Sequence, residues 1–385
     1  ISGAYNLPTS DGTNGQVLTT DGSGNVNFAA AGGGGGAALY AANESSPSAQ
    51  PSATGVNAIA IGDTAVSSGT DSFAFGKARA IGARSLAFNT GTNVSNGAIS
   101  ADAIAMGEFA KASNSMSIAI GYSSNSTGSQ AVGLGFVAYA TGNKSIALQR
   151  GLASGEDSLT AIITNNTSSY GASGANSIAM GYLAKANNSY ATVSGGASNV
   201  ASGFHSTVIG GSSNLADNIG STVLGGRYGT TRGIRGAAVF GGYGNQITAT
   251  QGTSQSGLYI LAEQTTDATA TALKTDNQSS SSTANQIVLP NGGAYAFTGT
   301  IVGREAASSG TECAAWKVEG LIRREANAGS TVLVNSSTTV LNNAPNWGMA
   351  LSADTTNGAL AITVTGAAKT IRWVGTITTT ELTFA

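Results

Sequence analysis

The sequence predicts an all-β protein in which a parallel β-solenoid precedes an antiparallel β-sandwich or jelly-roll domain. A short apolar segment recurs thirteen times between Asn57 and Gly242, at intervals of 14 or 15 residues over most of this stretch. Large and small residues alternate inside each copy, which is the period of two expected of a strand. After Gly257 the alternating segments become longer and include all three tryptophans, which indicates a second domain with a conventional core.

The first segment, residues 1–31, predicts a small N-terminal β-hairpin module. The pairs Asp11-Gly12 and Gly24-Asn25 are turn signals beside short β-like runs. Residues 32–56 follow and begin with five consecutive glycines. They predict a Gly-rich flexible linker. Alternatively, three chains packed closely around an axis would need glycine at these positions.

Residues 57–242 predict the solenoid itself. Each copy holds a segment such as Ile59-Ala60-Ile61, usually followed by glycine, and small polar residues suited to tight turns separate the copies. Thirteen stacked rungs spaced about 4.8 Å apart would form a thin rod roughly 60 Å long, with Ala and Gly filling its interior. Two longer intervals, 88–106 and 161–180, indicate rungs with inserted loops.

A roll this thin leaves one apolar row uncovered, either the row of Ile59 or the row of Ala60. A repeat that cannot bury its own face needs a neighbour, and identical rungs of parallel chains meet at identical heights. We therefore expect a homo-oligomer with cyclic symmetry. The rung arrangement also predicts that Gly210→Val or Ile120→Asp disrupts assembly far more than Ser124→Ala.

Beyond the solenoid, residues 243–257 predict a polar connector and residues 258–385 predict the C-terminal β-sandwich, with about nine strands. Segments 315–324 and 371–377 alternate as half-buried strands do. Trp316 and Trp373 lie in the middle of these segments and are predicted to be core residues.

Composition argues against several classes of function. Only 9% of the residues are charged and the net charge is −2, unlike a disordered polyelectrolyte or a basic nucleic-acid-binding protein. The sequence has no Cys/His cluster and no Asp-rich calcium repeat, so we expect no metal and no cofactor. The only histidine, His205, lies in a turn without a nucleophile-elbow motif, and the adjacent acids Glu156 and Asp157 would point to opposite faces of a strand. We therefore expect no catalytic site.

Candidate ligand-binding residues lie in loops. Arg227, Arg232 and Arg235 cluster in a longer turn, where they would either contact an anionic sugar or phosphate or belong to a solvated loop. The remaining candidates are aromatic and amide residues of loops, where we expect them to be exposed: Tyr228, Tyr243, Asn346 and Trp347. For Trp347, packing in the core is the alternative to receptor contact.

Segment 176–186, NSIAMGYLAKA, resembles the head repeat of YadA-type trimeric adhesins, and segment 191–211 carries a variant of it. The resemblance covers about half of the chain and implies a left-handed parallel β-roll that forms homotrimers. The same head repeat occurs in bacteriophage tail fibres. Segment 7–28, LPTSDGTNGQVLTTDGSGNVNF, is similar to a module frequent in such fibres, and segment 371–382 is similar to C-terminal domains of tail fibres from phages of marine and aquatic bacteria.

These resemblances predict a trimeric phage tail fibre, a structural protein of the extracellular virion tail. The N-terminal module would bind other tail or baseplate proteins, the roll would be a rigid spacer, and the distal domain or loops would bind a host-surface polysaccharide or outer-membrane component. One alternative is a fragment of a bacterial autotransporter-type adhesin, which is expected to carry a signal peptide, a stalk and a membrane anchor that this sequence does not show. Another is a tailspike polysaccharide depolymerase, which the scarcity of acidic residues disfavours.

Overall fold

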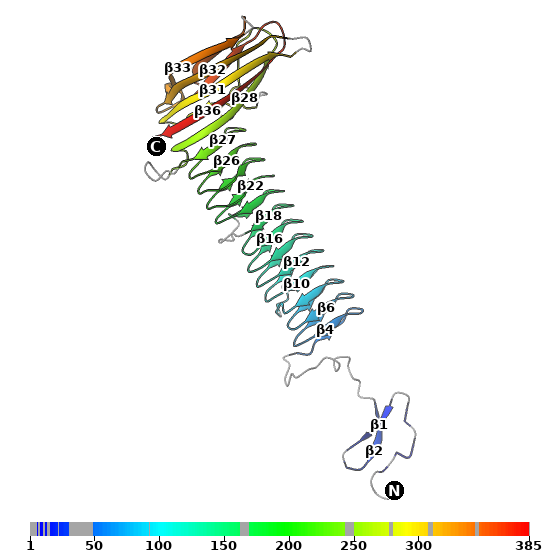
Figure 1. Ribbon diagram of the computed structural model, residues 1–385. Helices are drawn as coiled ribbons and strands as arrows, with labels where there is room; N and C mark the ends of the chain where they lie inside the picture. Colours follow the sequence, from blue (N-terminus) through cyan, green and yellow to red (C-terminus); the bar gives the residue numbers. More distant parts are fainter. Residues whose placement is uncertain are drawn as a thin grey trace.

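The computed structural model describes residues 6, 8–10, 12–13, 16–21, 23–30, 49–91, 93–161, 169–242, 250–276, 280–306, 311–342 and 346–384. Within these ranges the protein is almost entirely β-structure, and a single turn of 3-10 helix, η3 (Ala328–Ser330), is the one helical element. Figure 1 shows a long stack of short strands that carries a domain of longer strands at one end. The Gly-rich stretch 32–36 lies outside the described residues.

The N-terminal hairpin is present. Strands β1 (Gln16–Thr20) and β2 (Val26–Ala30) pair antiparallel. The carboxylate of Asp21 accepts hydrogen bonds from the backbone N–H groups of Ser23 and Asn25, at 2.8 and 3.1 Å, and so closes the turn. This is the local bonding that makes Asp a turn-forming residue.

The solenoid is a roll of two parallel sheets, and it has the thirteen rungs that the sequence predicts. We call the sheet with the longer strands the front sheet and the other the back sheet. The strands of the front sheet are β4 (Ile59–Ile61), β6 (Phe73–Phe75), β8 (Leu86–Phe88), β10 (Ile104–Met106), β12 (Ile118–Ile120), β14 (Val132–Leu134), β16 (Ile146–Leu148), β18 (Leu159–Ala161), β20 (Ile178–Met180), β22 (Thr192–Val193), β24 (Thr207–Val208), β26 (Thr222–Gly225) and β27 (Ala238–Gly241). The strands of the back sheet are β3 (Ser52–Ala53), β5 (Val66–Ser67), β7 (Arg79–Ala80), β9 (Gly97–Ala98), β11 (Lys111–Ala112), β13 (Asn125–Ser126), β15 (Tyr139–Ala140), β17 (Leu152–Ala153), β19 (Gly171–Ala172), β21 (Lys185–Ala186), β23 (Val200–Ala201) and β25 (Leu215–Ala216).

Small residues fill most of the interior of the roll. The middle residue of most three-residue front strands, such as Ala74 or Ala119, is fully buried against back-sheet residues such as Ala112. The flanking large residues point outward, and Ile120 is 38% exposed in the single chain. The uncovered apolar row is therefore the row of large residues, which settles the alternative that the sequence leaves open.

Left-handed backbone at the turns links each rung to the one before it. Met116 has a φ of 55°, and its N–H donates to the carbonyl of Ala101 at 3.0 Å. Val137, a β-branched residue for which this region is costly, also has a φ of 55°, and its N–H donates to the carbonyl of Tyr122 at 2.8 Å. The hydrogen bond between rungs offsets the strain, so residues other than glycine are accepted at these turns.

The front sheet continues into the C-terminal domain without a break. Strand β27 pairs antiparallel with β28 (Ser254–Thr265), which begins inside the segment 243–257 that the sequence predicts as a connector. The same sheet then continues with β36 (Ile371–Thr383), β31 (Gly293–Glu305), β32 (Cys313–Arg324) and β33 (Val332–Asn342). A smaller antiparallel sheet comprises β29 (Thr271–Ala272), β35 (Ala359–Thr365), β30 (Ile287–Val288) and β34 (Gly348–Asp354).

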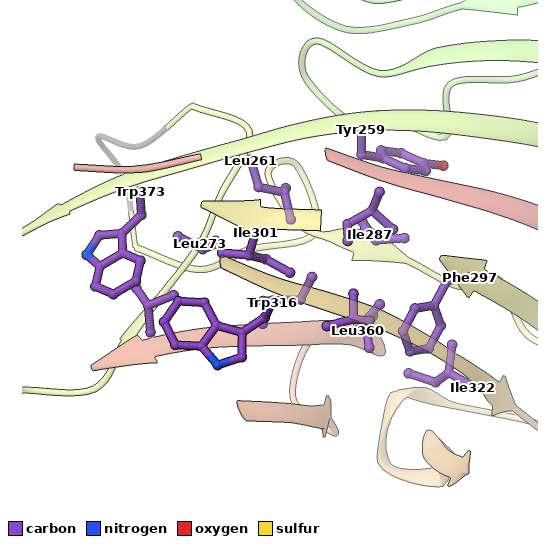
Figure 2. Close-up of a cluster of buried hydrophobic side chains, with 14 of the residues drawn as sticks. Tyr259, Leu261, Leu273, Ile287, Phe297, Ile301, Trp316, Ile322, Leu360 and Trp373 are labelled. Atoms are coloured by element: carbon purple, nitrogen blue, oxygen red, sulfur yellow. The ribbon is translucent and has the colours of Figure 1, made fainter. Parts of the chain in front are cut away.

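The two sheets of this domain share one hydrophobic core. Tyr259, Ile301 and Trp316 of the large sheet lie in the same cluster as Ile287 and Leu360 of the smaller sheet (Figure 2). Trp316 and Trp373 are core residues, as predicted from their positions within alternating segments.

Candidate functional site

The predicted arginine cluster of the turn after β26 separates into different roles. The guanidinium of Arg227 lies over the ring of Tyr228, 4.7 Å from its centroid, and its Nη2 donates to the Tyr228 hydroxyl at 3.0 Å. Arg235 instead donates from Nη1 to the carboxylate of Asp276 at 2.5 Å. The three arginines therefore do not converge on one ligand position.

Arg232 is part of a buried network that joins the last rung to the C-terminal domain. Its Nε lies 3.4 Å from Oε2 of Glu381, and its Nη2 donates to the carbonyl of Gly252 at 2.6 Å. The Glu381 carboxylate also accepts hydrogen bonds from Gln255 at 2.8 Å and from Tyr259 at 2.7 Å. A turn residue predicted to face a ligand thus serves as the counter-ion of an interior carboxylate.

Tyr259 is a permanent donor in this network. Burial, together with the negative charge of Glu381, holds the pKa of the Tyr259 phenol well above its usual value. The buried carboxylate therefore has hydrogen-bonding partners as well as a cation, the condition under which an interior charge is tolerated.

Two of the other loop candidates, Asn346 and Trp347, lie in the described residues. Trp347 is 5% exposed and packs 5.4 Å from the ring of Trp373, so its side chain belongs to the core, the alternative that the sequence analysis keeps open. Its neighbour Asn346 is exposed. Tyr243 lies outside the described residues.

Exposed aromatic rings also line up along the roll. Tyr122 stacks on Phe136 with 5.4 Å between centroids and an interplanar angle of 9°, and Phe109 meets Tyr122 edge-on. The guanidinium of Arg150 lies over the ring of Phe136, 5.1 Å from its centroid. Because the rings cover one another's faces, they stabilise the stacking of rungs and leave mainly ring edges for a ligand.

A groove lies on the outer face of the large C-terminal sheet. It has a volume of about 580 Å³, within the usual range for ligand sites of ~300–1,000 Å³. A second hollow of about 360 Å³ adjoins it and shares Thr298, Glu319 and Ser337 with it. We call the two together the sheet groove. It is lined by Ala296, Phe297, Thr298, Gly299, Thr300, Lys317, Val318, Glu319, Gly320, Leu321, Asn335, Ser336, Ser337, Thr339, Thr378, Thr379 and Thr380.

The sheet groove continues the outward face of the roll. The register runs from Ala238 of β27 to Leu258 of β28, and then to Thr378, Thr298 and Glu319 on the following strands. The row is therefore apolar at β27 and β28 and carries hydroxyl and charged side chains from β36 onward. Gly320 is the register partner of the core residue Phe297, and a Cβ there would lie 2.6 Å from the Phe297 ring on the inner side of the sheet.

The chemistry of the sheet groove suits a polyhydroxylated ligand. Hydroxyls of Thr298, Thr378 and Ser337 both donate and accept hydrogen bonds, while Glu319 accepts and Lys317 donates. Sequence reasoning misses this site because its residues are ordinary solvent-facing positions of strands. The signal that was available is the concentration of Thr at alternate positions of segment 371–383, but Thr is also simply favoured in strands.

Over the described ranges, no group of three or more His, Cys, Asp or Glu side chains is placed to hold a metal ion. Nor do those ranges contain a helix of the length and hydrophobicity needed to cross a membrane. His205 stacks on Tyr190 at 4.7 Å on the surface of the roll, in the turn where the sequence places it.

Comparisons with known proteins agree on the roll. Residues 53–78, 98–124, 126–148 and 172–198 match the YadA head domain repeat. This is a YadA-like β-roll. All four matched segments lie in the parallel solenoid or its first strand, and together they cover less than half of the chain.

Among solved structures, the chain is similar to the tailspike protein gp49 from Acinetobacter baumannii bacteriophage Fri1, a capsular polysaccharide depolymerase. The identity is 9% and the TM-score 0.21, with 74% of this chain and 45% of that protein covered. The chain thus spans less than half the length of that protein, and a likeness this distant carries no argument about function. A comparison with curated proteins gives no match.

Proposed function

We propose that this protein is a homotrimeric phage tail fibre that attaches a virion to a host cell surface. The N-terminal module binds other tail proteins, the roll is the spacer, and the sheet groove contacts a surface polysaccharide. The YadA-like repeat supports a fibre or adhesin, and the resemblance of the first and last segments to tail-fibre modules favours the phage assignment.

One observation supports assembly above the others. None of the thirteen front-sheet strands contains a charged residue, whereas the back sheet carries Arg79, Lys111 and Lys185. A long, uncharged face with exposed Ile, Leu and Phe side chains is typical of an interface. Parallel copies related by a threefold axis would cover three such faces at once, rung against rung.

The sheet groove supports binding rather than cleavage. Glycoside hydrolysis ordinarily requires two carboxyl groups on either side of the scissile bond. Among the residues that line the sheet groove, Glu319 is the one carboxylate. A site with hydroxyls, one acid and one amine can hold a glycan without the second acid that hydrolysis needs.

Light scattering tests the assembly. We expect a mass of three times 37.8 kDa for the full chain. Ile120→Asp should yield a folded monomer, because Ile120 is already partly exposed in the single chain. Lys111→Glu, a charge reversal on the back sheet, is the matched control and should remain trimeric. A monomeric wild-type chain would contradict the proposal.

Binding to cells tests the attachment. The labelled full chain should adsorb to some members of a panel of Gram-negative bacteria, and enzymatic removal of surface polysaccharide should abolish adsorption. Ser337→Tyr should block it by filling the sheet groove, whereas Val334→Tyr, on the same strand and outside the groove lining, should not. Adsorption to none of the cells would count against an attachment role.

A further inference from the structure

Two arginines lie side by side near one end of the sheet groove. Arg304 of β31 and Arg372 of β36 are register partners, and both are exposed on the same outer face of the sheet as Thr298 and Thr378. Like charges directly opposite each other on an antiparallel pair destabilise the sheet. The arrangement therefore needs either a compensating contact or a ligand.

Within the described ranges, no carboxylate pairs with either arginine. The Arg304 side chain makes no ion pair or hydrogen bond with any residue of those ranges, and the Arg372 side chain makes one hydrogen bond, from Nε to the neutral amide oxygen of Gln264 at 3.3 Å. Lys317, in the sheet groove, also has no ion-pair partner within those ranges.

This contrasts with three other cations of the domain. Lys274 pairs with Glu263, Arg323 with Glu325, and Lys369 lies 3.4 Å from the carboxylate of Glu305. These acids are thus already paired, and the outer face of the large sheet keeps three cations without an ion pair, Arg304, Arg372 and Lys317, against the single carboxylate of Glu319. In a protein of net charge −2, this is a local positive surface.

Geometry connects the arginine pair to the groove. The cross-strand pair of Thr300 and Lys317 lies four residues along β31 from Arg304, which corresponds to about 13 Å. An extended glycan several sugars long can reach both positions. Guanidinium groups bind carboxylate and phosphate in a bidentate manner, so an adjacent pair of them is suited to one anionic substituent.

We propose that the ligand of this face is an acidic polysaccharide. An anionic substituent binds between Arg304 and Arg372, a second one or a hydroxyl meets Lys317, and the sugar hydroxyls bind the Thr and Ser side chains of the sheet groove. This inference rests on the proposed attachment function and specifies the charge class of its receptor. Carboxylate and phosphate substituents share this chemistry, and the test below separates them.

The test measures the binding of the full chain and of two variants to three immobilised polymers. The polymers are alginate, which carries uronate carboxylates; poly(glycerol phosphate) teichoic acid, which carries phosphates; and dextran, which is neutral. We expect the wild-type chain to bind an acidic polymer and not dextran, with binding that weakens as salt rises. The double variant Arg304→Gln/Arg372→Gln should bind at least tenfold more weakly. Arg323→Gln is the matched control, since Arg323 lies on the same face but is paired with Glu325, and should stay within about twofold of the wild-type chain.

Three outcomes would overturn the inference: binding to neither acidic polymer, equal binding by the double variant, or loss of the wild-type mass in the double variant. The last would mean that the arginines contact another copy of the chain. Adsorption to cells separates the two proposals. If the wild-type chain and the double variant adsorb equally, attachment stands and the acidic ligand fails, whereas a wild-type chain that adsorbs to no cell removes the attachment function itself.

Discussion

The paired glycines of the last rungs are not equivalent. Gly211 has a φ of 85°, and a Cβ there would lie 2.0 Å from the carbonyl oxygen of Gly226 on the next rung. Gly210 is outside the left-handed region, and a Cβ there would meet nothing within 4 Å. Within one chain, therefore, the steric constraint belongs to the second glycine of the pair, and the expected effect of Gly210→Val on assembly stays a prediction.

This difference gives a direct test. Gly211→Ala should lower the free energy of unfolding by about 2 kcal/mol or more, because it combines a strained φ with a clash against backbone. Gly210→Ala should change it by less than about 0.5 kcal/mol. Thermal denaturation followed by circular dichroism measures both. Equal destabilisation by the two variants would contradict the described packing of these rungs.

The buried Glu381 network makes a second prediction at this scale. Arg232→Met should destabilise the chain by about 3 kcal/mol or more, because it leaves an interior carboxylate without its cation. The double variant Arg232→Met/Glu381→Gln should recover a large part of that loss. Arg323→Met, which breaks an exposed pair, should cost less than about 1 kcal/mol. An absence of recovery in the double variant would show that Arg232 acts through packing alone.

At the scale of the rung, the fully buried alanines limit the thickness of the roll. Ala119 pairs in register with Ala105 and Gly133 and faces the back sheet, so there is no room for a longer side chain. Ala119→Leu should destabilise the chain by about 1–3 kcal/mol or more through overpacking. Ile118→Leu, at an outward position of the same strand, should be nearly neutral. Urea denaturation compares them, and equal effects would place Ala119 outside the interior.

Rungs are predictable from sequence because their contacts are local: a residue pairs with its equivalent one period later. The strands of the C-terminal domain are also predictable, since alternation reveals them one at a time. The sheet groove is not, because Thr298, Glu319 and Thr378 become neighbours only through the pairing of three strands that are distant in sequence. The buried positions of the Trp347 and Arg232 side chains also depend on tertiary contacts, which no local sequence pattern reveals.

For the whole molecule, the stack of rungs is modular. Deleting residues 108–121 removes one complete rung and joins Gly107 to Tyr122, which reproduces the natural junction of Gly121 with Tyr122. We expect this deletion to retain the fold and to shorten the rod by about 4.8 Å, measured by small-angle X-ray scattering. Deleting residues 108–114, half a rung, should break the register and unfold the roll. A tolerated half-rung deletion would contradict the solenoid.

The unbroken hydrogen-bonded ladder from β4 through β27 to β33 has a mechanical consequence (Figure 1). Its hydrogen bonds run along the rod, so tension between the two ends pulls on them lengthwise and opens the stack one rung at a time. Each 14-residue rung that detaches replaces about 4.8 Å of rod by up to about 48 Å of extended chain. The roll would then unfold stepwise under tension and dissipate mechanical energy, so that a sudden pull at one end would reach the other end with reduced force.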